Sequence, residues 1–133
     1  MIRNLMSIIL LAVIIISCDQ DNEVSYIVDN QTSDSLKLEF AYSQDYFGID
    51  TGDTVIFLGG LCQQVLFVHS VISPKVYNPE MGKTMTFIVN FDITRIKDST
   101  RILKDVTLTK NWHYHETGEN SADIILSIYD SDF

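Results

Sequence analysis

The stretch "LKLEFA", residues 36–41, places apolar side chains at every second position. Successive side chains of a β-strand point to opposite faces of the sheet, so Leu36, Leu38 and Phe40 would share one face. This alternation is typical of a strand with one buried and one solvated face, as in antiparallel sheets. We therefore predict a strand here and expect a domain built of β-sheet.

Short apolar or alternating runs, separated by turn residues, continue on both sides of this strand. We predict strands over residues 24–28, 36–41, 54–58, 64–71, 85–91, 101–109 and 122–129. We predict turns or loops over residues 30–35, 48–53, 59–60, 73–83, 97–100 and 117–121. Two further runs extend the strands before them, residues 92–100 through a hairpin and residues 112–115 directly.

The number and spacing of these strands indicate the fold class. About seven to eight short strands without a long helix are typical of an all-β sandwich or barrel. We predict an antiparallel β-sandwich, with a small β-barrel as the alternative. Its length fits one domain, over residues 24–133. Residues 64–71 also fit a short helix, because Leu61, Val65 and Val68 could share one helical face.

The N-terminal segment has the pattern of a cleaved signal. Arg3 precedes an apolar block over residues 5–16, which is shorter than the roughly 20 residues that span a membrane but fits a signal-peptide core. Residues 15–18, Ile-Ile-Ser-Cys, resemble the lipobox of bacterial lipoproteins. The resemblance implies a signal peptide over residues 1–17, cleavage before Cys18, and acylation of Cys18 with diacylglycerol and a chain such as palmitate.

An acidic segment without apolar residues follows the cysteine, and residues 18–23 are predicted to be a tether. It resembles the acidic tether of surface-exported lipoproteins in Bacteroidota-type bacteria, which implies an outer-membrane lipoprotein displayed on the cell surface. A plain solvated spacer between lipid and domain is the alternative. Several acyl chains would hold a small domain firmly on the membrane.

Four short motifs lie along the rest of the chain: "YIVDNQTS" (26–33), "IDTGDTVIF" (49–57), "NWHYHETG" (111–118) and "LSIYDSDF" (126–133). Together they resemble small lipoproteins of the same bacterial group, most of them uncharacterised. The resemblance implies an immunoglobulin-like or transthyretin-like sandwich, and it implies no activity.

The charge of the chain argues against some classes of binding partner. The formal net charge is −9, and there is no basic patch, so nucleic acid is not an expected partner. The negative charge also leaves membrane attachment to the lipid on Cys18. Acylation of that thiol would leave Cys62 without a disulfide partner, and its apolar neighbours predict a buried thiol.

The candidate metal ligands are His113, His115 and Glu116. In a strand the two histidines share one face, and imidazole and carboxylate groups suit zinc or copper. A site would need a further ligand, such as His69 or an aspartate. The alternative is that the histidines face water, with no metal and no cofactor bound.

Four aromatic residues are candidates for ligand binding: Trp112, Tyr114, Tyr46 and Phe47. If Trp112 and Tyr114 faced outward, they would form an aromatic platform of the kind that stacks on sugars. If they faced inward, they would be core residues.

Three sequons, Asp followed by Ser or Thr and then an aliphatic residue or Thr, resemble the O-glycosylation sequon of Bacteroidota-type exported proteins. They place candidate glycans on Ser35, Thr54 and Ser99, at predicted turns or turn edges.

No nucleophile elbow, phosphate-binding loop, dinucleotide-binding motif or zinc-protease motif occurs. We therefore expect no enzyme, but a lipid-anchored cell-envelope protein with a non-catalytic binding or accessory module, whose partner is an envelope protein or a glycan. The alternatives are a glycan-binding surface lipoprotein of a nutrient-uptake system and an inhibitor or immunity-type protein.

Overall fold

The computed structural model describes residues 22–43, 52–71 and 88–133. In these ranges no helix is long and apolar enough to cross a membrane. The elements, in chain order, are β1 (Asn22–Asn30), β2 (Leu36–Tyr42), β3 (Asp53–Leu58), β4 (Gln63–Val71), β5 (Ile88–Arg95), β6 (Thr100–Arg101), the 3-10 helix η3 (Thr109–Asn111), β7 (His113–Glu116), β8 (Ser121–Ile128) and the 3-10 helix η4 (Asp130–Asp132).

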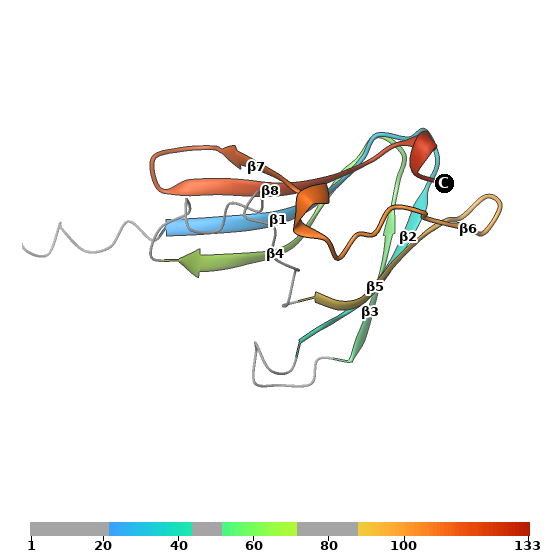
Figure 1. Cartoon of the computed structure of the whole chain (residues 1–133), viewed down its shortest axis with the longest axis horizontal. Coiled ribbons are helices and arrows are strands. Elements are labelled where there is room, and N and C mark those ends of the chain that lie inside the picture. The colour runs from blue at the N-terminus through green and yellow to red at the C-terminus, as the bar shows by residue number, and fades with distance from the viewer. Residues whose placement is uncertain (1–21, 44–51, 72–87) are drawn as a thin grey trace, which may run out of the picture.

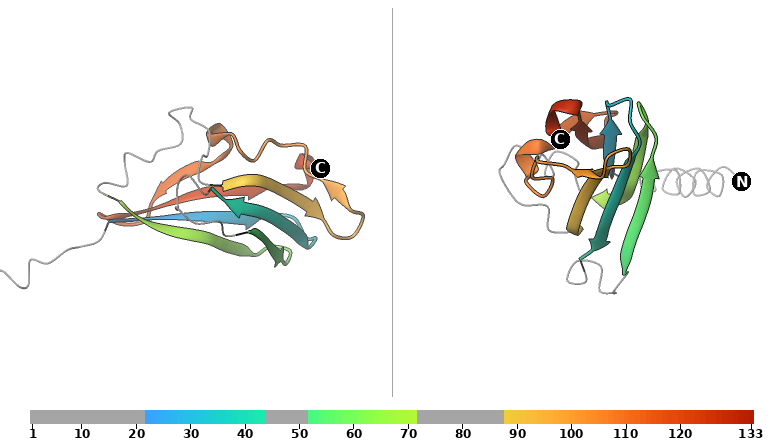
Figure 2. Two further views of the ribbon diagram at one scale, coloured as in Figure 1. Left: turned by 90° about the horizontal axis from the view of Figure 1, so that it is seen from below. Right: turned by 90° about the vertical axis from the view of Figure 1, so that its right-hand side faces the viewer.

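The strands form two four-stranded sheets, with the orders β4-β1-β8-β7 and β3-β2-β5-β6. The two sheets pack face to face and do not close into a barrel (Figures 1 and 2). The predicted β-sandwich is therefore confirmed, and the barrel alternative is wrong. One pair departs from the antiparallel expectation, because β1 and β8 run parallel. A parallel pair needs a long crossover, and here the chain between the first and last strands supplies it.

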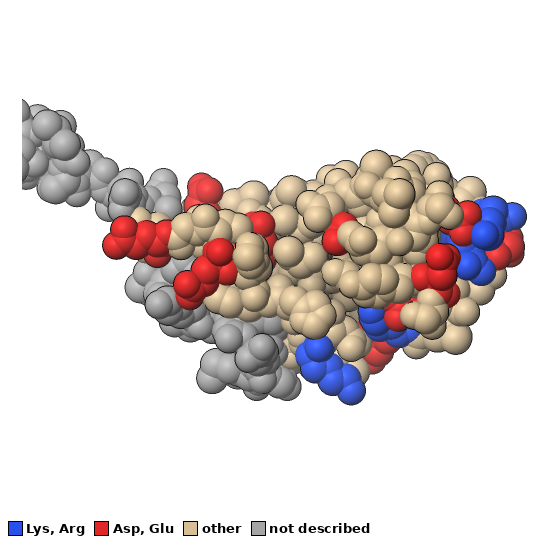
Figure 3. Space-filling model, turned by 90° about the horizontal axis from the view of Figure 1, so that it is seen from above, with Lys and Arg blue, Asp and Glu red and all other residues tan. Residues whose placement is uncertain are grey.

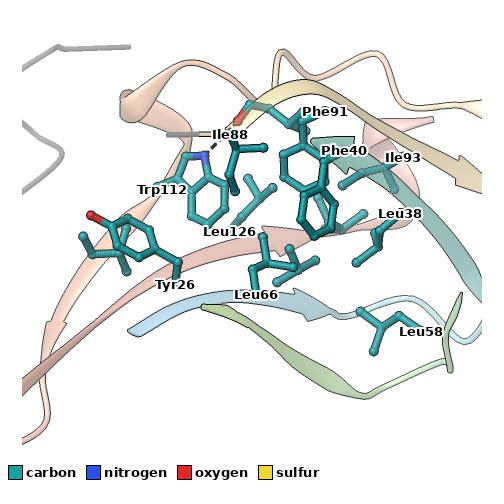
Figure 4. Packing of buried hydrophobic residues seen from close by; sticks show 14 of the residues in the cluster. Tyr26, Leu38, Phe40, Leu58, Leu66, Ile88, Phe91, Ile93, Trp112 and Leu126 are labelled. Atoms are coloured by element: carbon teal, nitrogen blue, oxygen red, sulfur yellow. Dashed lines mark hydrogen bonds between the residues drawn. The ribbon is translucent and has the colours of Figure 1, made fainter. Parts of the chain in front are cut away.

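The core forms where the alternation predicted it. Leu36, Leu38 and Phe40 are at most 1% exposed, whereas the residues between them are half-buried. Strand β8 alternates in the same way along its whole length. Side chains of both sheets meet in one cluster that includes Trp112 and Phe91 (Figure 4). Burial of these side chains is the main term that stabilises the sandwich.

Two turns lock one end of the sandwich. Asn30 is fully buried, and its Nδ2 donates to the carbonyls of Asp34 (2.8 Å) and Gly59 (2.9 Å). Its Oδ1 accepts from the backbone N–H (3.0 Å) and the hydroxyl (2.8 Å) of Thr32. The buried amide therefore has partners for all its donors, as buried polar groups require. It ties the turn after β1 to the turn between β3 and β4.

The sheets are also joined through a β-bulge. On β4 the pairing shifts from Tyr26↔Phe67 to Ile27↔Val65, which leaves Leu66 as the extra residue. A bulged residue lies outside the regular ladder of the sheet. The Leu66 carbonyl accepts a hydrogen bond from the Tyr42 hydroxyl of the other sheet, at 2.8 Å.

The strand predicted over residues 101–109 is wrong beyond Arg101, and the strand expected over residues 112–115 forms as the separate strand β7 of the other sheet. Thr100 and Arg101 pair with β5, the Ile102 N–H donates to the Ile93 carbonyl at 2.9 Å, and the chain then crosses irregularly to the other sheet. Asp105 causes this departure, because its carboxylate accepts from both the backbone N–H (3.0 Å) and the hydroxyl (2.6 Å) of Thr107. Such local side-chain bonds compete with sheet pairing. The crossover contributes Val106 to the core.

The other expected elements differ mainly at their ends. The strands predicted over residues 24–28, 36–41, 54–58, 64–71 and 122–129 are confirmed within two residues, and the helix alternative for 64–71 is wrong. Strand β1 begins at Asn22, so the last two residues of the predicted tether belong to the sheet. The 73–83 loop, residues 85–87, and residues 48–51 of the predicted turn lie outside the described residues.

Candidate functional site: an uncharged sheet edge

The described residues do not gather the predicted metal ligands into a metal-binding group. His113 and His115 lie on the exposed face of β7, opposite Ile125 and Asp123 of β8, and Glu116 ends the strand. Among the described residues, no group of three His, Cys, Asp or Glu side chains could hold a metal ion. The side chain of His69 lies outside the description. The histidines face solvent, as the alternative reading of this strand expected.

Trp112 is a core residue, and its candidate role in a ligand-binding aromatic platform is wrong. It is 1% exposed, and its Nε1 donates to the Val106 carbonyl at 2.8 Å. Tyr114 is half-buried on the same side of β7, and within the described chain its buried hydroxyl has no hydrogen-bond partner. Burial, with a smaller contribution from Glu116, raises the pKa of Tyr114. Tyr46 and Phe47 lie outside the described residues.

Two of the three candidate glycosylation residues lie at one end of the sandwich. Ser35 and Ser99 are exposed on adjacent turns, which are joined by a hydrogen bond from the Ile96 N–H to the Ser35 carbonyl (3.0 Å). Thr54 instead lies in strand β3, half-buried and opposite Phe40. Glycosylation of these residues remains a prediction.

Ion pairs hold the same two turns. Lys97 pairs with Asp34 at 2.6 Å, and Arg95 pairs with Asp98 at 2.8 Å. The hydrogen bond from Arg95, followed by those from Thr100, lowers the pKa of Asp98 to about 2. The Arg95 guanidinium also lies 4.9 Å from the centre of the Phe133 ring. The basic side chains of this end are therefore neutralised locally and form no free basic patch.

The opposite end of the sandwich is acidic. Glu23 at the beginning of β1 and Glu116 and Glu119 around the β7–β8 turn are exposed, and the Glu23 N–H donates to the Asn120 carbonyl (2.9 Å). In Figure 3, Asp and Glu side chains gather at one end without neighbouring Lys or Arg in the described residues, whereas Lys and Arg lie toward the other end.

A different surface carries five of the nine exposed large hydrophobic residues of the described ranges. Residues 54–68 contain no charged side chain, although charged residues make up 20% of the whole chain. They form β3 apart from Asp53, the Gly59–Cys62 turn and most of β4; β3 and β4 are edge strands of the two sheets. We call this stretch the β3–β4 edge. Its exposed large hydrophobic residues are Val55 (47%), Phe57 (70%), Leu61 (71%), Val65 (46%) and Val68 (52%).

Cys62 lies in the turn of this edge. The predicted burial of its thiol is wrong, because the side chain is exposed and unpaired. The turn brings it to the surface: the Cys62 carbonyl accepts from the Asn30 N–H at 2.9 Å, and Leu61 has a positive φ of 55°. Apolar neighbours in sequence therefore did not indicate burial at this turn.

The four sheet edges differ in how they are protected. β6 has only two residues, and β7 is short and carries two histidines and a glutamate. β4 is interrupted by the bulge at Leu66. Short length, charge and bulges are the usual devices that prevent edge-to-edge association. β3 has none of them between Thr54 and Leu58, and its pairing with β2 is regular.

The exposure of Val55 and Phe57 was not predicted from the sequence. Their run of apolar residues resembles that of a strand buried on both faces. The absence of charge over residues 54–68 was the available signal, but it does not tell an edge from a central strand.

Comparison of the chain with protein-family models, with curated proteins and with solved structures gives no significant match. A function must therefore be argued from the residues and geometry of the chain itself.

Proposed function

We propose that the protein is a lipid-anchored cell-envelope lipoprotein whose β-sandwich is a non-catalytic binding or accessory module for a protein partner. The observation that carries the binding role is the β3–β4 edge, where apolar side chains are exposed on an unprotected strand. Monomeric soluble proteins rarely leave such surfaces uncovered unless they bind something. The lipobox-like residues 15–18 support the anchor.

The position of β1 supports a close attachment to the membrane. Only three residues separate Cys18 from Asn22, so these four steps along the chain would keep the acylated cysteine within about 14 Å of the beginning of β1. The acidic end of the sandwich is therefore next to the lipid. The inhibitor alternative would use this acidic end, which a nearby membrane would hinder. The glycan alternative loses Trp112, because that side chain is in the core.

The anchor is tested by Cys18→Ser in the whole chain. We expect the unaltered protein to be cleaved before Cys18, to gain the mass of its acyl chains and to sediment with membranes. The Cys18→Ser variant should lack the acyl mass and should no longer be processed by the lipoprotein peptidase. Intact mass spectrometry and detergent partitioning measure both properties. Cys62→Ser is the control and should be acylated like the unaltered chain. An unaltered protein without acyl mass would contradict the proposed anchor.

A further inference from the structure

We propose that the β3 edge is a dimerisation strand, and that its partner is β3 of a second copy of this chain, paired antiparallel. The inference rests on the proposed binding role of the β3–β4 edge and names the partner that this edge would take. It begins from the edges of the described sheets, among which β3 alone lacks a bulge, a charged interior position and a very short length.

The outward face of β3 is apolar, although it belongs to the outer surface of its sheet. Val55 and Phe57 are 47% and 70% exposed, and their cross-strand neighbours on β2 are Glu39 and Lys37. Those two neighbours pair with each other at 2.7 Å. Their charges are therefore satisfied without β3, and no strand of the described ranges pairs with the outer edge of β3 beside the apolar pair.

One register of self-pairing matches every position of the strand. If Ile56 lies opposite Ile56 of the second copy, Val55 lies opposite its Phe57, and Phe57 lies opposite its Val55. Thr54 then lies opposite Leu58, and Asp53 opposite Gly59. No two like charges face each other, and aromatic–β-branched pairs stabilise antiparallel sheets. A two-fold axis midway between the two Ile56 residues, perpendicular to the sheet, generates this closed arrangement.

The resulting dimer joins the two β3-β2-β5-β6 sheets into one continuous sheet. Pairing along a single short strand buries less surface than the roughly 1,200 Å² of a standard interface, so the dimer should be weak in solution. Two copies held in one membrane would meet at a much higher local concentration. With the two-fold axis along the membrane normal, both copies would lie with this sheet parallel to the membrane.

Cysteine crosslinking in membranes tests the register. The whole chain, carrying Cys62→Ser, is expressed as two distinguishable copies, one with Val55→Cys and one with Phe57→Cys. Directly opposite residues lie about 4.5–5.5 Å apart, within disulfide range. Residues 55 of both copies lie on a diagonal of about 7–8 Å, which is too long. We expect the mixed pair to crosslink about tenfold more than Val55→Cys alone or Val55→Cys with Val68→Cys. Equal yields for these combinations, or no crosslink, would overturn the proposal.

A charge placed on the strand gives an independent test. Val55→Lys should raise the dissociation constant of the dimer about tenfold or more, because an edge lysine disfavours strand pairing. Val68→Lys is the matched control on β4, since Val68 is 52% exposed, and it should leave the dimer unchanged. Sedimentation of the whole chain in mild detergent measures both, and circular dichroism checks that each variant is folded. If the unaltered chain is monomeric at all concentrations and binds a different protein at this edge, the inference is wrong.

Discussion

At the scale of single residues, Asn30 and Gly60 show how the end of the sandwich is specified. Asn30 bridges two turns from a fully buried position. Gly60 lies against one of those turns so closely that an added Cβ would be 2.3 Å from the Ser33 carbonyl oxygen. The requirement for glycine at this position is therefore a requirement for space between two backbones.

Gly60→Ala should destabilise the domain by about 1–3 kcal/mol, because the new methyl group must displace a turn that Asn30 holds in place. Gly59→Ala is the control, since its Cβ would meet only the Cys62 sulfur, at an ordinary contact distance of 3.5 Å. Urea unfolding of both variants measures the difference. Equal midpoints would show that the turn moves at little cost.

At the scale of elements, strand β4 depends on a side chain from the other sheet. The bulge leaves Leu66 without a regular partner on β1, and the Tyr42 hydroxyl donates to its carbonyl. Tyr42 also packs edge-on against Phe67, with ring centres 5.9 Å apart. The bulge that interrupts the β4 edge is thus supported from inside the sandwich.

Tyr42→Phe should lower the free energy of unfolding by about 1–2 kcal/mol, because a partly buried carbonyl loses its donor while the ring contacts remain. Burial raises the pKa of Tyr42 above its usual value of 10.0. The hydroxyl therefore stabilises the fold fully below pH 10, and this contribution is lost as the pH rises through the raised pKa. Denaturation at pH 7 and above pH 10 checks this, since the difference between the two proteins should shrink at high pH. A constant difference would contradict the assigned role.

At the scale of the whole molecule, the two ends of the sandwich have different surroundings. Cys18 would lie near the beginning of β1, whereas Cys62 contacts the other end of that strand through the Asn30 N–H. A nine-residue strand is about 26 Å long, so the exposed thiol of Cys62 lies at the end of the sandwich opposite the beginning of β1.

This arrangement makes surface display measurable. A membrane-impermeant maleimide should label Cys62 on intact cells if the lipoprotein faces outward, and the yield should not rise after the outer membrane is permeabilised. Cys62→Ser should abolish labelling, because acylation leaves Cys18 without a free thiol. Labelling only after permeabilisation would place the domain on the inner side of the outer membrane.

Much of the fold could be predicted from local patterns. Alternation at Leu36, Leu38 and Phe40 correctly assigned the buried face of β2, and the same period put Trp112 and Tyr114 opposite the histidines of β7. It did not decide which face of β7 was buried. The strand predicted over residues 101–109 failed because Asp105 and Thr107 offer the backbone a local hydrogen-bonding alternative.

The sequence by itself determined the fold class and most strand positions, because both depend on neighbours along the chain. Only the tertiary structure decided which strands are edges, that β1 and β8 are parallel neighbours, and that Phe57 is exposed while Trp112 is buried. These features depend on pairing between residues far apart in sequence. A side chain's period fixes the face it shares with its neighbours on the strand, whereas the partner strand and the opposing sheet determine whether that face meets protein or water.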